Sequence, residues 1–201
     1  LLSFPAHMTT WEIPVDRFLQ LDAVTSATPL GILATDGVGA LQEQGVNWLQ
    51  LLLGNCGGSL GEVSVIALLL GGVYLMIRKV ITWHIPVSFI GVVALLTGIM
   101  WLVDGDAYAS PVFHLVSGGL ILGAFFMATD MVSSPVTARG MLIFGAGCGL
   151  ITVMIRLFGS FPEGVSFAIL VMNGFVPLIE RRTRPMKFGE TRAIRKERAN
   201  A

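Results

Sequence analysis

Five long apolar stretches constrain the fold of this chain more than any other feature. A helix needs about 20 mostly apolar residues to cross a bilayer. Of the 201 residues, 54% are hydrophobic and 13% are charged, whereas soluble domains carry about 25% charged residues. The sequence therefore predicts an all-α polytopic membrane protein with about five transmembrane helices and an extracytoplasmic loop. The predicted helices cover residues 60–78, 85–103, 112–129, 140–158 and 164–179.

The basic residues are concentrated in a few connections and at one end of the chain, which predicts the orientation. Arg78 and Lys79 follow the first apolar stretch, Arg139 follows the third, and residues 180–201 hold eight Arg or Lys against three Glu. The positive-inside rule places these segments in the cytoplasm. We accordingly divide the chain into an extracytoplasmic loop with a glycine-rich segment (1–59), a five-helix transmembrane domain (60–179) and a basic cytoplasmic tail (180–201).

The predicted loop contains the segment DAVTSAT, which ends at Thr28 and is followed by Pro29. Side chains of Asp, Ser and Thr bind nearby backbone N–H groups, so the chemistry alone favours a turn or a helix cap. Pro29 favours extended backbone at Thr28 and an outward side chain. The segment is also similar to D-x-x-[ST]-G-A-T, the signal at which flavin transferases join FMN to a threonine hydroxyl through a phosphoester. It departs from that signal at Ser26, where glycine is usual.

Two acidic residues at the ends of apolar stretches are candidates for an ion path. Glu62 follows the glycine-rich segment 54–62, and Asp130 follows the third stretch. An ionisable group inside a membrane indicates function because burying its charge is costly. The alternative is an interfacial position, where each carboxylate is solvated or caps a helix. Arg156, near the outer end of the fourth stretch, is interpreted as a snorkelling or partner-pairing residue.

The cysteines and histidines do not form a metal-binding pattern. Cys56 and Cys148 lie far apart, without a CxxC motif, and are expected to be small buried side chains. His7, His84 and His114 lie at predicted interfaces and are expected to be partly exposed structural residues. The sequence predicts no metal site.

An ordered set of sequence blocks resembles the D-subunit family of the Rnf electron-transport complex. The blocks appear in family order and cover nearly all of the chain. The related B subunit of the sodium-pumping NADH:quinone reductase is an alternative, and so is a membrane channel or transporter without a redox role. The blocks are SFPAHMTTW (3–11), DAVTSATPL (22–30), GGSLGE (57–62), TWHIP (82–86), GAFFMATDMVSSPVTARG (123–140), IRLFGSFPEGVSFAILVMN (155–173) and PLIERRTRP (177–185).

The resemblance implies a component of a redox-driven ion translocase in the bacterial inner membrane. The complex passes electrons between ferredoxin and NAD and couples this to transport of Na⁺ or H⁺. The resemblance assigns covalent FMN to Thr28, within an attachment motif that includes Asp22, Thr25, Ser26 and Ala27. It implies as partners the other Rnf subunits, including the flavin-bearing G subunit and membrane subunits, together with an FMN transferase and the lipid bilayer, but no nucleic acid.

The resemblance also implies how much of the protein this sequence represents. The family has two related membrane halves, and the chain resembles the second half with the loop before it. The first residues, LLSFP, read as the end of an apolar segment. We therefore expect the second half of a two-repeat transmembrane bundle, with sites where the halves meet.

Overall fold

The computed structural model describes residues 11–12, 25–26, 28–43, 48–53, 64–105, 108–159 and 163–185, which are almost entirely helical. Within these residues, β1 (Trp11–Glu12) and β2 (Thr25–Ser26) form an antiparallel pair with Trp11 opposite Ser26. The helices are α2 (Pro29–Glu43), α3 (Trp48–Leu53), α4 (Val65–Ile77), α5 (His84–Val103), α6 (Pro111–Val116), α7 (Leu120–Leu122), the π-helix η1 (Gly123–Met127), α8 (Ala138–Phe158) and α9 (Val165–Thr183).

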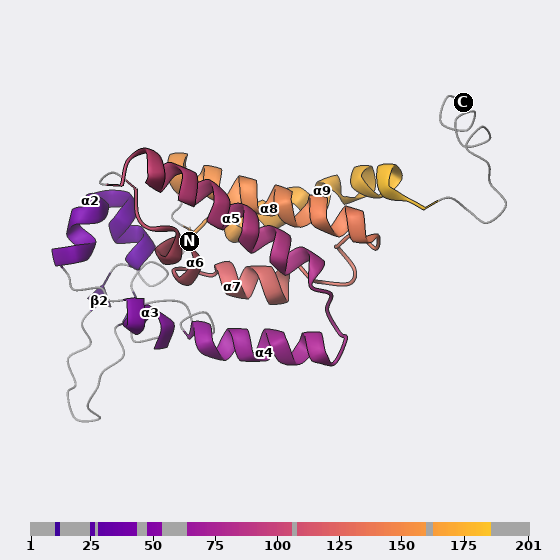
Figure 1. Cartoon of the computed structure of the whole chain (residues 1–201), viewed down its shortest axis with the longest axis horizontal. Helices are drawn as coiled ribbons and strands as arrows, with labels where there is room; N and C mark the ends of the chain where they lie inside the picture. Colours follow the sequence, from indigo (N-terminus) through magenta and orange to yellow (C-terminus); the bar gives the residue numbers. More distant parts are fainter. Residues whose placement is uncertain are drawn as a thin grey trace, which may run out of the picture.

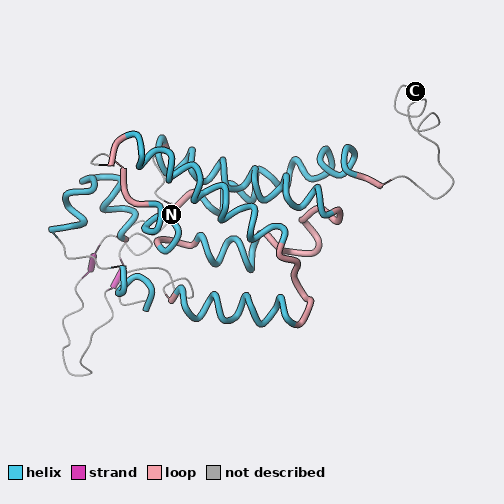
Figure 2. The backbone as a smooth tube through the Cα atoms, in the orientation of Figure 1, coloured by secondary structure: helices cyan, strands magenta, loops and turns pink. Residues whose placement is uncertain are grey.

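The long helices α5, α8 and α9 lie along one another and form the body of the molecule (Figure 1). Helix α7 and η1 lie between this body and α4, which forms the lower edge in Figures 1 and 2. Helices α2, α3 and α6 gather at one end of the bundle, and the last turns of α9 extend from the other end. The chain thus has two distinct ends, and the predicted flavin-attachment segment leads into α2 at one of them.

Serine and threonine caps explain where three of the helices begin. The hydroxyls of Ser64, Ser110 and Thr137 each accept a hydrogen bond from the backbone N–H three residues later, at the starts of α4, α6 and α8. Such a cap satisfies one of the N–H groups that a helix start leaves without an intrahelical partner. Pro111 occupies the first position of α6, where a missing N–H has no cost.

Glycines on α8 let α5 approach closely. A Cβ atom built on Gly145 would overlap Oγ of Ser88 and lie 2.7 Å from the carbonyl oxygen of Ile85. One built on Gly149 would lie 2.9 Å from the carbonyl oxygen of Phe89, which is fully buried. These glycines therefore serve close helix–helix packing.

Replacement of Gly145 by alanine is expected to destabilise the bundle by about 1–3 kcal/mol, because the added methyl group forces α5 away from α8. The matched control is Gly91→Ala on α5, since a Cβ there meets no atom within 4 Å. Thermal unfolding in detergent micelles measures both changes. Equal unfolding temperatures for the two variants would contradict the close packing seen at Gly145.

The surface of the bundle suits a lipid environment. Among the described residues, α5 and α8 are long and apolar enough to cross a membrane, with mean hydropathies of 2.2 and 2.0. Leu70, Leu102 and Leu170 are 68%, 78% and 69% exposed, and exposed apolar area of this extent is uncommon on soluble monomers. The predicted helical fold class is confirmed, whereas the five crossings and the two-repeat layout stay predictions.

The third apolar stretch departs from the expected continuous helix over 112–129. Helix α6 ends at Val116, and Ser117 is extended with φ −90° and ψ 139°. Gly118 has a φ of +70°, a conformation that side chains with a Cβ rarely adopt. The chain becomes helical again at Leu120 and then widens into η1. The expectation of one unbroken helix here was wrong, because apolar content alone does not reveal a change in backbone direction.

Candidate functional site

Thr28 is the residue that caps the start of α2. Its Oγ1 accepts a hydrogen bond from the Gly31 N–H at 3.1 Å, and its carbonyl oxygen accepts one from the Ile32 N–H at 3.0 Å. Pro29 occupies the first helical position, and its fixed φ suits a helix start. The predicted helix-cap interpretation of this threonine is therefore confirmed. The Thr28 side chain is only half-buried, so the structure leaves part of it accessible.

The first turn of α2 fixes Thr28 against the interrupted third stretch. Leu30, two residues after Thr28, is 3% exposed. A Cβ on Gly118 would lie 2.5 Å from Cδ1 of Leu30 and 3.2 Å from Nη2 of Arg156. Leu30 therefore packs onto the bare backbone at Gly118, next to the guanidinium of Arg156. A glycine at the break is needed both for its positive φ and for this close approach.

The guanidinium of Arg156 connects three segments around the break. Its Nη1 donates to the carbonyl oxygen of His114 at 2.6 Å, and its Nη2 donates to that of Ser117 at 3.2 Å. Its Nε donates to the carbonyl oxygen of Glu163 at 3.2 Å, just before α9 begins. The last carbonyls of a helix lack intrahelical partners, and a cation beside them also offsets the negative end of the helix dipole. Arg156 thereby caps the C-terminal end of α6.

The break also holds polar groups that the bundle does not satisfy. His114 and Ser117 are 2% and 1% exposed. Among the described residues, Nδ1 of His114 and Oγ of Ser117 have no hydrogen-bond partner. A cavity of about 180 Å³ adjoins His114 and is also lined by Leu30, Arg156 and Tyr108, among other residues. Buried polar atoms beside a cavity point to a polar occupant such as water.

The structure places the other predicted attachment residues only in part. Thr25 and Ser26 form β2, and their pairing with β1 holds the backbone extended just before Thr28. Asp22 and Ala27 lie outside the described residues, and so does Glu62 of the predicted ion path. The recognition roles of these residues stay predictions.

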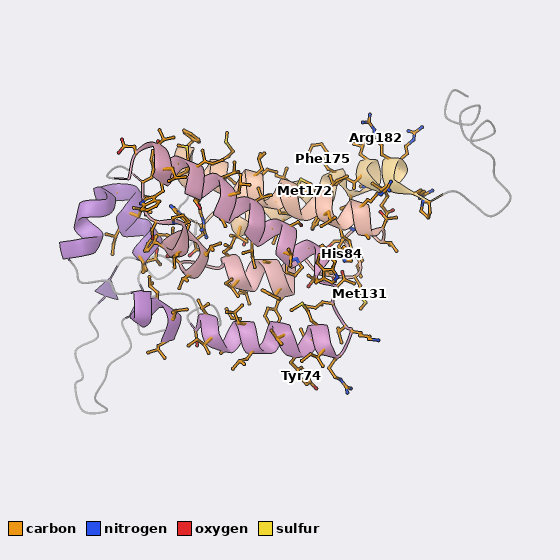
Figure 3. All side chains as sticks on the ribbon, in the orientation of Figure 1. Tyr74, His84, Met131, Met172, Phe175 and Arg182 are labelled. Carbon is orange, nitrogen blue, oxygen red and sulfur yellow. The ribbon has the colours of Figure 1, made fainter. Side chains whose placement is uncertain are left out.

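Asp130 does not share a site with Thr28. It is exposed, and one of its carboxylate oxygens accepts a hydrogen bond from the Ser133 hydroxyl at 3.0 Å. Asp130 precedes the start of α8, whereas Arg156 and the Thr28 region lie near the end of α8. An α-helix of 21 residues is about 30 Å long. In Figure 3 the neighbouring Met131 lies at the end of the bundle opposite α2.

Two side chains proved more important to this region than the sequence suggested. His114 was expected to be partly exposed but is buried, because α6 turns inward at the break. Arg156 was interpreted as snorkelling or pairing, and the structure adds three backbone carbonyls to which it donates hydrogen bonds. The adjacent glycines Gly118 and Gly119 were a signal for the break. Cys148 is buried with a free thiol, as predicted, whereas Cys56 and His7 lie outside the described residues.

Comparison with known proteins decides which family this arrangement belongs to. The model of the NQR2, RnfD, RnfE family matches residues 1–189. The chain belongs to this family. The resemblance found in the sequence blocks is therefore confirmed at the level of the family.

Among the described residues, no group of three or more His, Cys, Asp or Glu side chains is placed to hold a metal ion.

Individual relatives in the family are similar over almost the whole chain. Over 197 residues the chain is 48% identical to the D subunit of the proton-translocating ferredoxin:NAD(+) oxidoreductase complex of Clostridium ljungdahlii, covering 96% of the chain and 59% of the relative. The Na(+)-translocating counterpart of Acetobacterium woodii is 46% identical over 200 residues, covering 98% and 58%. The D subunit of the ion-translocating oxidoreductase complex of Stutzerimonas stutzeri is 40% identical over 212 residues, covering 94% and 60%. The chain thus spans 58–60% of the length of these relatives.

Proposed function

We propose that this chain belongs to the D subunit of an ion-translocating ferredoxin:NAD⁺ oxidoreductase and carries FMN covalently on Thr28. The observation that carries the proposal is the family membership, with relatives named as D subunits over 94–98% of the chain. The apolar helices support a membrane location. Partners in the proposal are the other subunits of the complex, including the flavin-bearing G subunit, and the transferase that attaches the flavin.

The position of Thr28 fits a phosphate-linked group. Thr28 lies at the N-terminal end of α2, where backbone N–H groups and the helix dipole favour negative charge. If Thr28 carried a phosphoester, the backbone N–H groups of the first turn of α2 would be the donors available to it, as at other phosphorylated helix starts. The Thr28 side chain is partly exposed, as an attachment point has to be. When bound, the flavin supplies the oxidation and reduction chemistry, which no side chain can replace.

The residues of this chain hold the attachment point in place. The β1–β2 pair fixes the backbone before Thr28, and Leu30 fixes the first turn after it. Arg156 fixes the break against which Leu30 packs. In this proposal Thr28 is an anchor that determines where electrons arrive, and it takes no part in turnover as a nucleophile.

The charges at the two ends of the bundle support the proposed orientation. Arg78, Arg139 and Arg182 lie at the ends of α4, α8 and α9 that face away from α2. The positive-inside rule then places Thr28 on the extracytoplasmic side of the bacterial inner membrane and the C-terminus in the cytoplasm. The remaining finer proposals, five crossings and a two-repeat bundle, follow from the apolar stretches and from the length of the relatives.

The experiment that tests the flavin proposal is mass spectrometry of the peptide that contains Thr28. The full-length protein is produced in cells with and without the FMN transferase. The peptide is expected to gain the mass of FMN only when the transferase is present, and flavin fluorescence should remain with the denatured protein. An unmodified Thr28 in cells that hold an active transferase would refute the proposal.

A second candidate is a component of a sodium-pumping NADH:quinone reductase, since the matching family model includes NQR2. The names of the relatives favour ferredoxin and NAD as the redox couple. Membrane vesicles that contain the complex distinguish the two candidates. Flavin reduction by NADH with quinone as acceptor, in the absence of ferredoxin, would favour the reductase.

Asp130 is proposed to contribute to the ion path at the end of the bundle opposite Thr28. Asp130→Asn is expected to lower ion uptake into vesicles severalfold while covalent flavin is retained, because the change removes the negative charge that attracts a cation. Ser133→Ala is the matched control, since it removes the hydrogen bond to the carboxylate but leaves its charge. Similar uptake by wild type and Asp130→Asn would exclude Asp130 from the path.

A further inference from the structure

At the basic end of the bundle, a cavity lies between the first turn of α8 and the last turn of α9. It has a volume of about 940 Å³. Two hydrogen bonds hold its walls together. The Thr137 hydroxyl donates to the Thr183 hydroxyl at 2.8 Å, and the Val136 N–H donates to a carboxylate oxygen of Glu180 at 3.3 Å. The cavity is thus formed by contacts between residues more than 40 positions apart in the sequence.

The lining of this cavity favours an anion. Arg139, Arg182 and Arg184 contribute three guanidinium groups against the single carboxylate of Glu180, a formal surplus of +2. The Glu180 carboxylate also accepts a hydrogen bond from the Val136 N–H. The N-terminal end of α8 adds positive potential, because its helix dipole points into this region. Guanidinium groups bind phosphate through paired, charge-assisted hydrogen bonds.

Apolar side chains line part of this cavity and continue beyond it along α8 and α9. Ile143 lies one helical turn beyond Arg139, lines the cavity and is 51% exposed. On α9, Phe175 and Leu178 are 50% and 60% exposed. Figure 3 shows Arg182 at the end of α9, beyond Met172 and Phe175. Arginines therefore stand at the edge of an exposed apolar helix surface, which is where a bilayer changes from hydrocarbon to headgroups.

We propose that this cavity binds the phosphate headgroup of an anionic phospholipid, with an acyl chain along the exposed apolar side chains of α8 and α9. A free phosphate ion matches the arginines but leaves the apolar wall unused. A lipid uses both, and basic recesses between membrane helices on the cytoplasmic side are known to take such headgroups. The proposed site is separate from Thr28 and does not depend on flavin attachment.

The test uses the full-length protein in nanodiscs made from an equimolar mixture of phosphatidylglycerol and phosphatidylcholine. The protein is then extracted into detergent, and the phospholipid that remains bound is identified by mass spectrometry. Arg139→Gln/Arg182→Gln is compared with Arg181→Gln, whose residue is on the same turn of α9 but does not line the cavity. Retained phosphatidylglycerol is expected to fall at least about fivefold in the double variant and to stay near the wild-type level in the control.

Three outcomes would overturn the proposal. The first is equal retention of phosphatidylglycerol by all three proteins, and the second is an equal loss in Arg181→Gln, which would show a general effect of charge. The third comes from a separate arm, in which inorganic phosphate or phosphatidylglycerol is added to the delipidated protein and the unfolding temperature is measured. An equal increase with phosphate alone would assign the cavity to a small anion.

Discussion

Thr28→Asn is expected to abolish covalent flavin attachment and electron transfer through this protein while the helical bundle stays folded. Asparagine caps helices about as well as threonine, so it preserves the hydrogen bond that Oγ1 of Thr28 accepts from Gly31. It has no hydroxyl group that can form a phosphoester. Mass spectrometry of the Thr28 peptide and electron transfer by the assembled complex measure the two losses, and thermal unfolding measures the fold.

Two further variants separate attachment from general damage to the loop. Thr28→Ser keeps the hydroxyl and is expected to retain flavin in part. Thr35→Ala removes another threonine hydroxyl of α2, one that donates to the Gly31 carbonyl, and is expected to retain flavin fully. Covalent flavin on the Thr28→Asn protein would show that attachment takes place at another residue.

Arg156→Leu is expected to destabilise the protein by about 3–5 kcal/mol. The change removes the donors for the carbonyl oxygens of His114, Ser117 and Glu163, and a buried acceptor without a partner costs about 1–3 kcal/mol. Leucine fills part of the volume but offers no donor. The free energy of unfolding of Arg156→Lys should lie between those of the wild type and Arg156→Leu. An ammonium group cannot span the three acceptors in the planar geometry of a guanidinium.

The control for Arg156→Leu is Arg78→Leu, which makes the same replacement at an exposed arginine just after α4. Unfolding in detergent with increasing denaturant gives the free energy for each variant. A second measurement, the rate of proteolysis around Thr28, reports on the packing of Leu30 against the break. If Arg156→Leu unfolds like Arg78→Leu, the three hydrogen bonds do not stabilise the bundle.

The sequence predicted the helices well wherever local chemistry decides their ends. Pro111 marked the start of α6, and apolar stretches bounded by turn residues located α5 and α8 to within a few residues. The break at Ser117–Gly119 was not predicted, because small residues such as Ser and Gly are also common inside closely packed membrane helices. Gly118 at this break has a positive φ and lies against Leu30, a residue distant in sequence.

The candidate site could be predicted only at its centre. Thr28 was proposed because the segment before it is similar to a known attachment signal, with Ser26 in place of the usual glycine, and its attachment role stays a prediction. The hydrogen bonds that Arg156 donates to the break could not be predicted from the sequence, since its acceptors at His114 and Ser117 are 42 and 39 residues away. Arginine near a helix end has several uses, and only the fold shows which carbonyls lie within its reach.

The shared use of one guanidinium by α6, the break and the start of α9 has a mechanical consequence. Movement of any one of these segments away from the others breaks at least one hydrogen bond to the same side chain, so Arg156 links the positions of all three. These segments therefore support the first turn of α2, which begins beside Thr28. In the proposed complex, the distance from a flavin on Thr28 to another electron carrier is then expected to depend on how the proteins dock.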